Sequence, residues 1–316
     1  MKRVFLFIIV LISCTVGVRA QDDMQLSQYF MSMGYYNPAY AGTTGDLNML
    51  GLFHQQWIGM PNASTAFLVV ADMPIKFGST NHGIGLVVNT ESIGLDQSTK
   101  FGFQYAYKQK LFGGILSGGL QVGIFNRAFD GTKVHIPEDN DYYQQEDEAI
   151  PRTAVQAMAL DVNLGLYYTH KNFYAGVGVT HITEPELHYE ENASSYLSRG
   201  LNLTGGYNIQ LRNPLYELQP SVFLMTNMQN SFLADITGRV VYNKMFNGGF
   251  SWRVNNSVAL LLGATFGRLQ VGYSYEYPTT AIRKASSGGH EVLVRYQLKL
   301  KKTKTGKNRH KSVRIL

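Results

Sequence analysis

The stretch GLNLTGGYNIQL, residues 200–211, alternates apolar and polar side chains. Its apolar positions are Leu201, Leu203, Tyr207, Ile209 and Leu211, and its polar positions are Asn202, Thr204, Asn208 and Gln210. A period of two is typical of a half-buried β-strand. In a soluble protein the apolar face would pack on a core. In a transmembrane barrel it would contact lipid, and the polar face would line the interior.

About fourteen segments of this kind follow one another along the chain, and no segment has a convincing helical pattern. Most of them are 9–13 residues long, close to the length that crosses a membrane at a tilt. The expected strands centre on residues 46–56, 63–73, 83–92, 98–109, 115–127, 155–169, 172–183, 200–211, 217–227, 232–243, 246–254, 257–266, 269–277 and 290–300. An even number and a closed edge are expected, because an open edge has no hydrogen-bond partner in hydrocarbon.

The last two expected strands show which side chains share a face. Val292, Val294 and Tyr296 lie on one side of residues 290–300, and Glu291 and Arg295 lie on the other. In VGYSYEY, residues 271–277, the three tyrosines share a face opposite Ser274 and Glu276. Tyrosines near strand ends suit a membrane-interface girdle. Cross-strand aromatic packing in a soluble sheet is the alternative for that feature.

The lengths of the connections favour the membrane barrel. The three longest, about 128–154, 184–199 and 278–289, are the fifth, seventh and thirteenth, so all three lie at one end. The connections at the other end are short, as in outer-membrane barrels with short periplasmic turns and longer external loops. We therefore predict an all-β protein, a transmembrane antiparallel β-barrel of about 14 strands in the outer membrane.

The N-terminal residues 1–20 have the layout of a secretory signal peptide. Lys2 and Arg3 precede an apolar run from Val4 to Ile12, and Ala20 ends a small-residue cleavage site. A lipoprotein-type site at Cys14 is the alternative to cleavage after Ala20. Cys14 is the only cysteine, so a chain cut after Ala20 has no disulfide, thiolate metal ligand or cysteine nucleophile.

The net charge of +6 comes from the two ends of the chain. Residues 299–316 contain eight Lys or Arg and no acid, and the signal segment contains three more, which leaves residues 21–298 at about −5. No nucleic-acid-binding body is therefore expected. The tail, residues 301–316, is expected in the periplasm. It either contacts an acidic polymer such as peptidoglycan or an acidic partner protein, or is a disordered end that solubilises the chain.

Two clusters have the residue types of metal sites but not their spacing. Residues 138–148, EDNDYYQQEDE, lack the spacing of an EF-hand and are expected to be a solvated acidic loop. His181, Glu184, Glu186 and His188 match no familiar zinc pattern. We expect no metal and no cofactor.

Three histidines lie on expected strands or at their ends: His54, His82 and His290. They are predicted to be polar positions that face the lumen. No GxSxG or similar nucleophile motif is present, and we expect no enzymatic activity.

Several blocks resemble the PorP/SprF family of outer-membrane proteins, which belongs to the type IX secretion and gliding machinery of Bacteroidetes. The resemblance begins with QLSQYFMSMGYYNPAYAG, residues 25–42, and continues with HQQWIGMPNASTAFLVVADMPI, residues 54–75. GYSYEY, residues 272–277, and GGHEVLVRYQL, residues 288–298, extend it to the end of the barrel. Where the family usually has Arg in the second block, this sequence has His54 or Gln55. The acidic loop and the long basic tail also depart from the family pattern.

The resemblance implies a barrel that acts by association. The expected partners are periplasmic ring proteins of the secretion system or a secreted surface adhesin, together with outer-membrane lipid. A transport barrel for a hydrophobic or small solute is the alternative function, and an outer-membrane lipid hydrolase is the third.

The family blocks also supply two sets of candidate site residues. Those for lumen plugging or partner docking are Gln28, Tyr29, Asn37, Pro38, Ala39, Tyr40, Ala41 and Gly42. The barrel positions in family motifs are Gln56, Trp57, Gly59, Gly272, Tyr273, Ser274, Tyr275, His290 and Glu291. Residues 21–45 contain Asn37-Pro38 and Gly42, so they are predicted to be a non-strand segment that precedes a barrel of residues 46–300.

Overall fold

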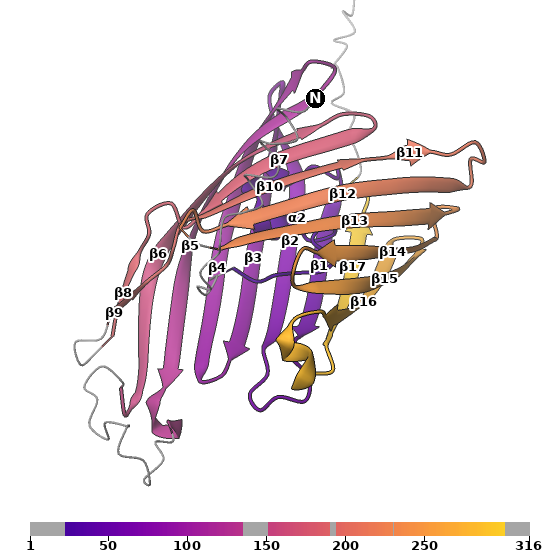
Figure 1. Cartoon of the computed structure of the whole chain (residues 1–316). Helices are drawn as coiled ribbons and strands as arrows, with labels where there is room; N and C mark the ends of the chain where they lie inside the picture. Colours follow the sequence, from indigo (N-terminus) through magenta and orange to yellow (C-terminus); the bar gives the residue numbers. More distant parts are fainter. Residues whose placement is uncertain (1–22, 135–150, 190–193, 230, 301–316) are drawn as a thin grey trace, which may run out of the picture.

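The computed structural model describes residues 23–134, 151–189, 194–229 and 231–300. Its main sheet joins fifteen elements in antiparallel order, and β10 and β11 are two parts of one strand interrupted at Asn208. The result is a closed barrel of fourteen strands (Figure 1). The strands are β1 (Leu47–Gln55), β2 (Thr65–Phe77), β3 (Thr80–Ile93), β4 (Asp96–Leu111), β5 (Gly114–Asp130), β6 (Ala154–Thr169), β7 (Phe173–Thr180), β10 (Gly200–Tyr207) with β11 (Ile209–Gln210), β12 (Tyr216–Thr226), β13 (Phe232–Tyr242), β14 (Phe246–Arg253), β15 (Ser257–Phe266), β16 (Leu269–Pro278) and β17 (Gly289–Leu298).

Two pairings close the barrel. The first strand pairs with the last from Leu47↔Leu298 to Gln55↔His290. On the other side β10 pairs with β12 from Leu201↔Thr226 to Gly206↔Ser221. Closure leaves no strand of the main sheet without two neighbours, as a membrane barrel requires. The predicted fold class and strand number are confirmed.

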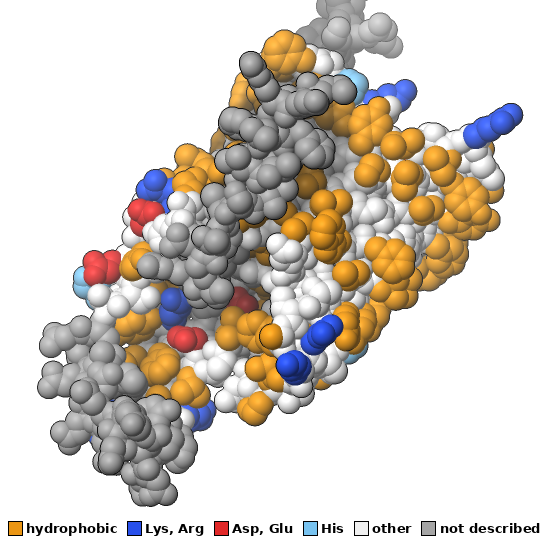
Figure 2. Space-filling view, in the orientation of Figure 1, with side chains coloured by type: hydrophobic (Ala, Val, Ile, Leu, Met, Phe, Trp, Pro, Cys, Tyr) orange, Lys and Arg blue, Asp and Glu red, His pale blue; other side chains and the backbone are white. Residues whose placement is uncertain are grey.

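The polar face of each strand points inward. In β10, Leu203 is 38% exposed on the outer face, whereas its neighbours Asn202 and Thr204 are 2% and 6% exposed. In β4, Phe101 and Phe103 are exposed outside, and Lys100 and Gln104 are buried inside. Figure 2 shows hydrophobic side chains spread over the visible outer surface of the sheet. An apolar belt of this extent on a barrel is suited to lipid.

The two ends of the barrel differ. Short turns connect the strands at the end where β1 begins and β17 ends. The opposite end has the long connections, with a hairpin of β8 (Glu186–His188) and β9 (Ser194–Tyr196) and the helical turns η2 (Gly131–Lys133) and η4 (Ala281–Lys284). Residues 1–20, the acidic loop 138–148 and the tail 301–316 lie outside the described residues. Among the described residues, no helix is long and apolar enough to span a membrane.

Residues 23–46 form a segment inside the barrel, which we call the plug segment. It contains the helical turn α2 (Met33–Tyr36) and the 3-10 turn η1 (Pro38–Tyr40). The side chain of Asn37 accepts a hydrogen bond from the amide of Ala39, and Pro38 occupies the first position of η1. Asn at the cap and Pro at the first position favour such a turn over a strand.

Glycines in the wall let the backbone of the plug segment approach closely. A Cβ atom built on Gly119 of β5 would lie 2.2 Å from the amide nitrogen of Ala39. One on Gly83 of β3 would overlap the carbonyl of Ala41, and one on Gly272 of β16 would lie 2.3 Å from the side-chain oxygen of Gln28. The wall and the plug segment are therefore complementary at these positions, since any side chain would need the space that the segment occupies.

The Gly119→Ala substitution is predicted to lower the free energy of unfolding by about 1–3 kcal/mol, the usual cost of overpacking. Urea unfolding of the barrel in detergent micelles measures this. Gly238→Ala is the matched control, because a Cβ at Gly238 of β13 meets nothing within 4 Å. Equal stability of the two variants would show that the plug segment does not pack tightly against β5.

Candidate functional site

The candidate site is the contact between the plug segment and the inner wall. All eight candidates for plugging or docking lie in this segment, and all except Tyr40 are buried. Tyr29, Ala39 and Ala41 have no exposed surface. In this conformation the seven buried candidates contact the wall of their own barrel, and only Tyr40 is partly exposed.

One buried charge cluster lies at Asp23, the first described residue of the plug segment. The Asp23 carboxylate lies 3.6 Å from the Lys100 ammonium group and 3.5 Å from Nε2 of His181. Thr180 donates a hydrogen bond of 2.6 Å to the same carboxylate. Nδ1 of His181 lies 2.8 Å from Asp161, which is also 3.4 Å from Lys100. Three strands and the plug segment thus contribute to one network of alternating charges.

The cluster changes the titration of its two members outside the strands. Burial opposes ionisation of Asp23, but the charges of Lys100 and His181 outweigh it and hold the pKa of the carboxyl well below its usual range. Burial and the Lys100 charge lower the pKa of His181, but Asp23 and Asp161 outweigh them and raise it to about 8. An ionised Asp23 and a protonated His181 therefore stabilise each other near neutral pH.

A second cluster holds the next residues of the plug segment. Glu291 of β17 accepts hydrogen bonds from the amides of Ser27, at 3.0 Å, and Gln28, at 2.9 Å. Glu276 of β16 accepts a bond of 2.9 Å from the Ser27 hydroxyl. Arg253 of β14 lies 3.0 Å from Glu276 and 3.0 Å from Asp235. The arginine thus balances two buried carboxylates, one of which bonds directly to the plug segment.

Side-chain amides of the wall bond to the backbone of the plug segment further along. Gln104 donates to the carbonyl of Gly34 at 2.6 Å, and Asn202 donates to that of Tyr36 at 3.0 Å. Arg295 donates to the carbonyl of Met31. In the opposite direction, the side chain of Asn37 donates to the carbonyls of Leu166, at 3.0 Å, and Val177, at 3.1 Å. The bonds from Gln104, Asn202 and Arg295 give the carbonyls of the irregular plug segment partners in the wall.

The end of the plug segment is tied to the wall near the short turns. Asp72 of β2 accepts hydrogen bonds of 2.8 Å from the amide of Gly42 and from the side chain of Asn48. Lys108 of β4 donates to the hydroxyl of Thr43 at 2.8 Å. The plug segment is therefore bonded to the wall at intervals from Asp23 to Thr43.

Apolar packing adds to these polar contacts. The ring of Tyr29 stacks on Phe223 of β12 with centroids 5.1 Å apart, and its hydroxyl lies 2.8 Å from that of Ser221. The ring of Tyr36 also packs on Phe223, with ring centroids 4.6 Å apart. This small core lies inside the barrel, so filling the lumen also buries hydrophobic surface.

The family-motif positions fall into three groups. Gln56, Trp57 and Gly59 lie in the loop after β1, where Ile58 donates a backbone hydrogen bond of 2.9 Å to Gly288. The blocks 54–75 and 288–298 therefore meet in space. Gly272, Ser274 and Glu291 point into the lumen, whereas Tyr273, Tyr275 and His290 lie on the outer face.

The lumen-facing prediction is wrong for two of the three histidines. His54 is buried on the inner face. His82 and His290 lie on the outer face, where each is covered by tyrosines of the neighbouring strand. Nδ1 of His82 lies 2.6 Å from the hydroxyl of Tyr105, and that of His290 lies 2.7 Å from Tyr273. A tyrosine hydroxyl satisfies each imidazole there, so neither ring needs the polar lumen.

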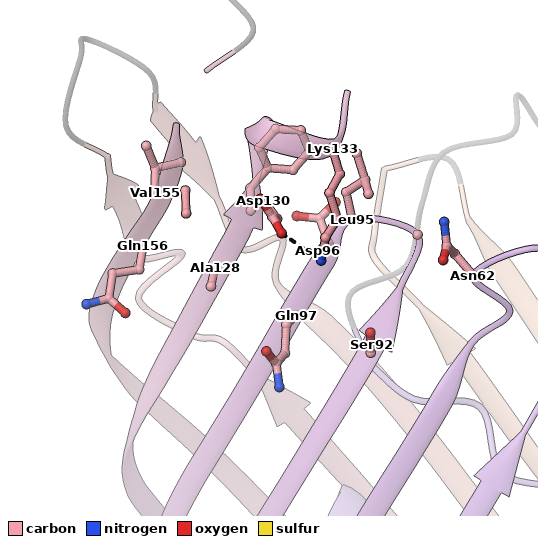
Figure 3. Close-up of a pocket in the computed structure, with 13 residues that line it drawn as sticks. Asn62, Ser92, Leu95, Asp96, Gln97, Ala128, Asp130, Lys133, Val155 and Gln156 are labelled. Carbon is pink, nitrogen blue, oxygen red and sulfur yellow. Dashed lines mark ion pairs between the residues drawn. The ribbon is translucent and has the colours of Figure 1, made fainter. Parts of the chain in front are cut away.

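The end with the long connections has a surface pocket between β3, β4, β5 and β6 (Figure 3). Its ion pair joins Asp130 to Lys133 at 2.8 Å, and the lysine side chain is 70% exposed. A solvent-exposed ion pair contributes little free energy and gives no indication that the pocket binds a ligand. Within the described ranges, no group of three or more His, Cys, Asp or Glu is arranged to hold a metal ion.

Only part of the wall side of these clusters follows from the sequence patterns. Glu276 and Glu291 lie on the predicted polar faces of their strands, but the patterns do not pair them with the plug segment. Lys100, Asp161 and Arg253 are missed, although each is a charged residue on the polar face of an alternating strand. That placement is the signal that could have identified them, since a charge facing the interior of a barrel needs a partner.

Comparisons with known proteins identify one family. The family model described as "Type IX secretion system membrane protein PorP/SprF" matches residues 18–296. No curated protein matches the chain. Among solved structures, a FadL homologue from Pseudomonas aeruginosa is 9% identical with a TM-score of 0.43, over 79% of this chain and 88% of that one. CdiB from Acinetobacter baumannii is 8% identical with a TM-score of 0.42, over 80% of this chain and 60% of that one.

The Arg253→Gln substitution is predicted to destabilise the barrel by about 3–5 kcal/mol, because it leaves Asp235 and Glu276 as buried carboxylates without a counter-charge. Urea unfolding in micelles measures the loss. Arg283→Gln, which removes an exposed arginine from η4, is the control and should leave stability unchanged. A small loss for Arg253→Gln would mean that water replaces the guanidinium.

Stability is predicted to fall by about 2 kcal/mol as the pH rises from 6.5 to above 8. The pKa of His181 is raised from 6.5 to about 8 in the folded protein, so its contribution is complete below 6.5 and is lost through 8. Urea unfolding at several pH values tests this. His181→Asn should reduce the dependence, whereas His188→Asn, at a side chain that is 72% exposed, should retain it in full. A flat wild-type profile would contradict the assignment.

Proposed function

The chain belongs to the PorP/SprF family of type IX secretion system membrane proteins, and from this we propose that it is an outer-membrane barrel that docks other secretion components. The proposed partners are periplasmic ring proteins of the system or a secreted surface adhesin. In this proposal the barrel works by association and catalyses no reaction.

The plug segment is the observation that carries the proposal. Its residues are bonded to the wall from Asp23 to Thr43, and its aromatic side chains fill the interior. A filled lumen supports a role as an anchor rather than as an open channel. The surfaces left for partners are then the two ends of the barrel.

Partner docking is tested by affinity purification of a tagged barrel from gently solubilised outer membranes. We expect periplasmic ring proteins or a large surface adhesin to co-purify, and mass spectrometry identifies them. Gly119→Ala and Gly238→Ala serve as a matched pair. If partner binding needs an ordered plug segment, only the first variant should lose the partners. Recovery of the barrel alone from wild-type membranes would contradict docking.

A transport barrel is the competing function, and planar-bilayer conductance distinguishes the two. The wild-type barrel is expected to be closed, and a variant without residues 24–42 is expected to conduct. A wild-type barrel that conducts, or that binds a small or hydrophobic solute, would favour transport. Residual closure after the deletion would show that other parts of the chain fill the lumen.

A further inference from the structure

Six basic residues form a ring at the end of the barrel with the short turns. Each of the six turns there has one of them within it or beside it. This cationic ring consists of Lys76, Lys110, Lys171, Arg212, Lys244 and Arg268. All six are exposed, and within the described ranges none of them forms an ion pair. Six positive charges thus surround one rim, and no described acid forms an ion pair with any of them.

Exposed apolar side chains accompany the cations. Phe77 follows Lys76 and is 61% exposed, and Phe112 lies two residues after Lys110 and is 86% exposed. At the β13–β14 turn Phe246 is 48% exposed, and at the β15–β16 turn Phe266 is 55% exposed. A phenylalanine beside a cation suits the boundary between hydrocarbon and headgroups, where the ring contacts acyl chains and the charge stays at the polar level.

Acidic residues are few at this rim and common at the other. The acids near the short turns are Asp46 and Glu217, and Glu217 accepts a hydrogen bond of 2.6 Å from Gln219. At the opposite end the charges are mixed, as in the pairs Lys133–Asp130 and Arg199–Glu184. The excess of positive charge therefore belongs to one rim and not to the barrel as a whole.

We propose that the cationic ring binds the phosphate groups of anionic phospholipids in the leaflet around this end of the barrel. The cations are spread over every turn of a closed barrel, and lipid surrounds a barrel on all sides. A docked protein would instead favour a patch on one side. With the phenylalanines in the acyl region, each cation reaches the phosphate level. In the orientation of the proposed function, this leaflet is the periplasmic one.

Native mass spectrometry of the purified barrel in neutral detergent tests the proposal. The probes are dioleoyl phosphatidylglycerol and dioleoyl phosphatidylcholine, titrated separately, with inorganic phosphate at equal concentration as the control for a free anion. We expect the wild type to retain phosphatidylglycerol preferentially. Each cation should contribute about 5-fold in affinity for a lipid beside it, given the usual strength of such contacts.

Variants at the two ends of the barrel distinguish an effect of the cationic ring from an effect of net charge. Lys244→Gln with Arg268→Gln should reduce phosphatidylglycerol retention, and glutamine at all six positions should reduce it further. Arg283→Gln with Lys284→Gln removes the same charge as the first pair from the opposite end and should retain the preference. Circular dichroism measures the β-sheet content of each variant. Heat-modified gel mobility shows whether the barrel is closed by the pairing of β1 with β17. Together they establish that each variant is folded.

Two results would overturn the proposal. Retention of phosphatidylglycerol by the six-glutamine variant at the wild-type level would show that the ring does not bind lipid. The second result is a six-glutamine variant that retains lipid like the wild type but no longer co-purifies with periplasmic proteins. It would assign the ring to protein docking instead. Because the lipid titration uses purified barrel alone, its failure would leave the docking proposal intact, and failure of docking would leave the lipid result intact.

Discussion

The structure depends on one constraint, that every charge on the inner face of the barrel must find a partner in the lumen. Closing fourteen strands places Lys100, Arg253 and Arg295 inside, together with acidic side chains, away from bulk water. Buried charges are costly unless they are paired and hydrogen-bonded. The plug segment supplies the missing partners, as when Asp23 contacts Lys100 and the amides of Ser27 and Gln28 bond to Glu291.

The same constraint explains why the plug segment has so little regular structure. An extended chain could pair only with a sheet edge, and a closed barrel has none. The segment turns repeatedly instead, through α2 and η1, so that its peptide groups face different strands. Gly34 and Tyr36 present their carbonyls to Gln104 and Asn202 on separate parts of the wall. Glycines such as Gly119 and Gly83 provide the space for this irregular backbone.

Much of the wall could be predicted from sequence, because its information is local. The alternation of Leu203 with Asn202 and Thr204 predicts the direction of each side chain without knowledge of any neighbour. The odd-numbered connections include the long ones and the even-numbered connections are short, which predicts which connections share an end of the barrel. Asn37-Pro38 likewise predicts a turn from adjacent residues alone.

The internal network could not be predicted, because it depends on the register of distant strands. Arg253, Asp235 and Glu276 meet only because β13, β14, β15 and β16 pair with a particular stagger around the barrel. The error at His82 and His290 has the same origin. A histidine is a polar residue, but its ring can lie on the outer face if a neighbouring strand supplies a hydrogen-bond partner. For His82 that partner is the hydroxyl of Tyr105 on β4.

Filling the lumen has a consequence for where this protein can interact. A barrel whose interior is occupied by its own chain has only its lipid-facing surface and its two ends available. These surfaces differ in chemistry. Among the described residues, the outer surface is apolar, one rim has cations without ion pairs beside phenylalanines, and the other rim has long loops with mixed charges. Rims of such different composition suit different environments on the two sides of a membrane.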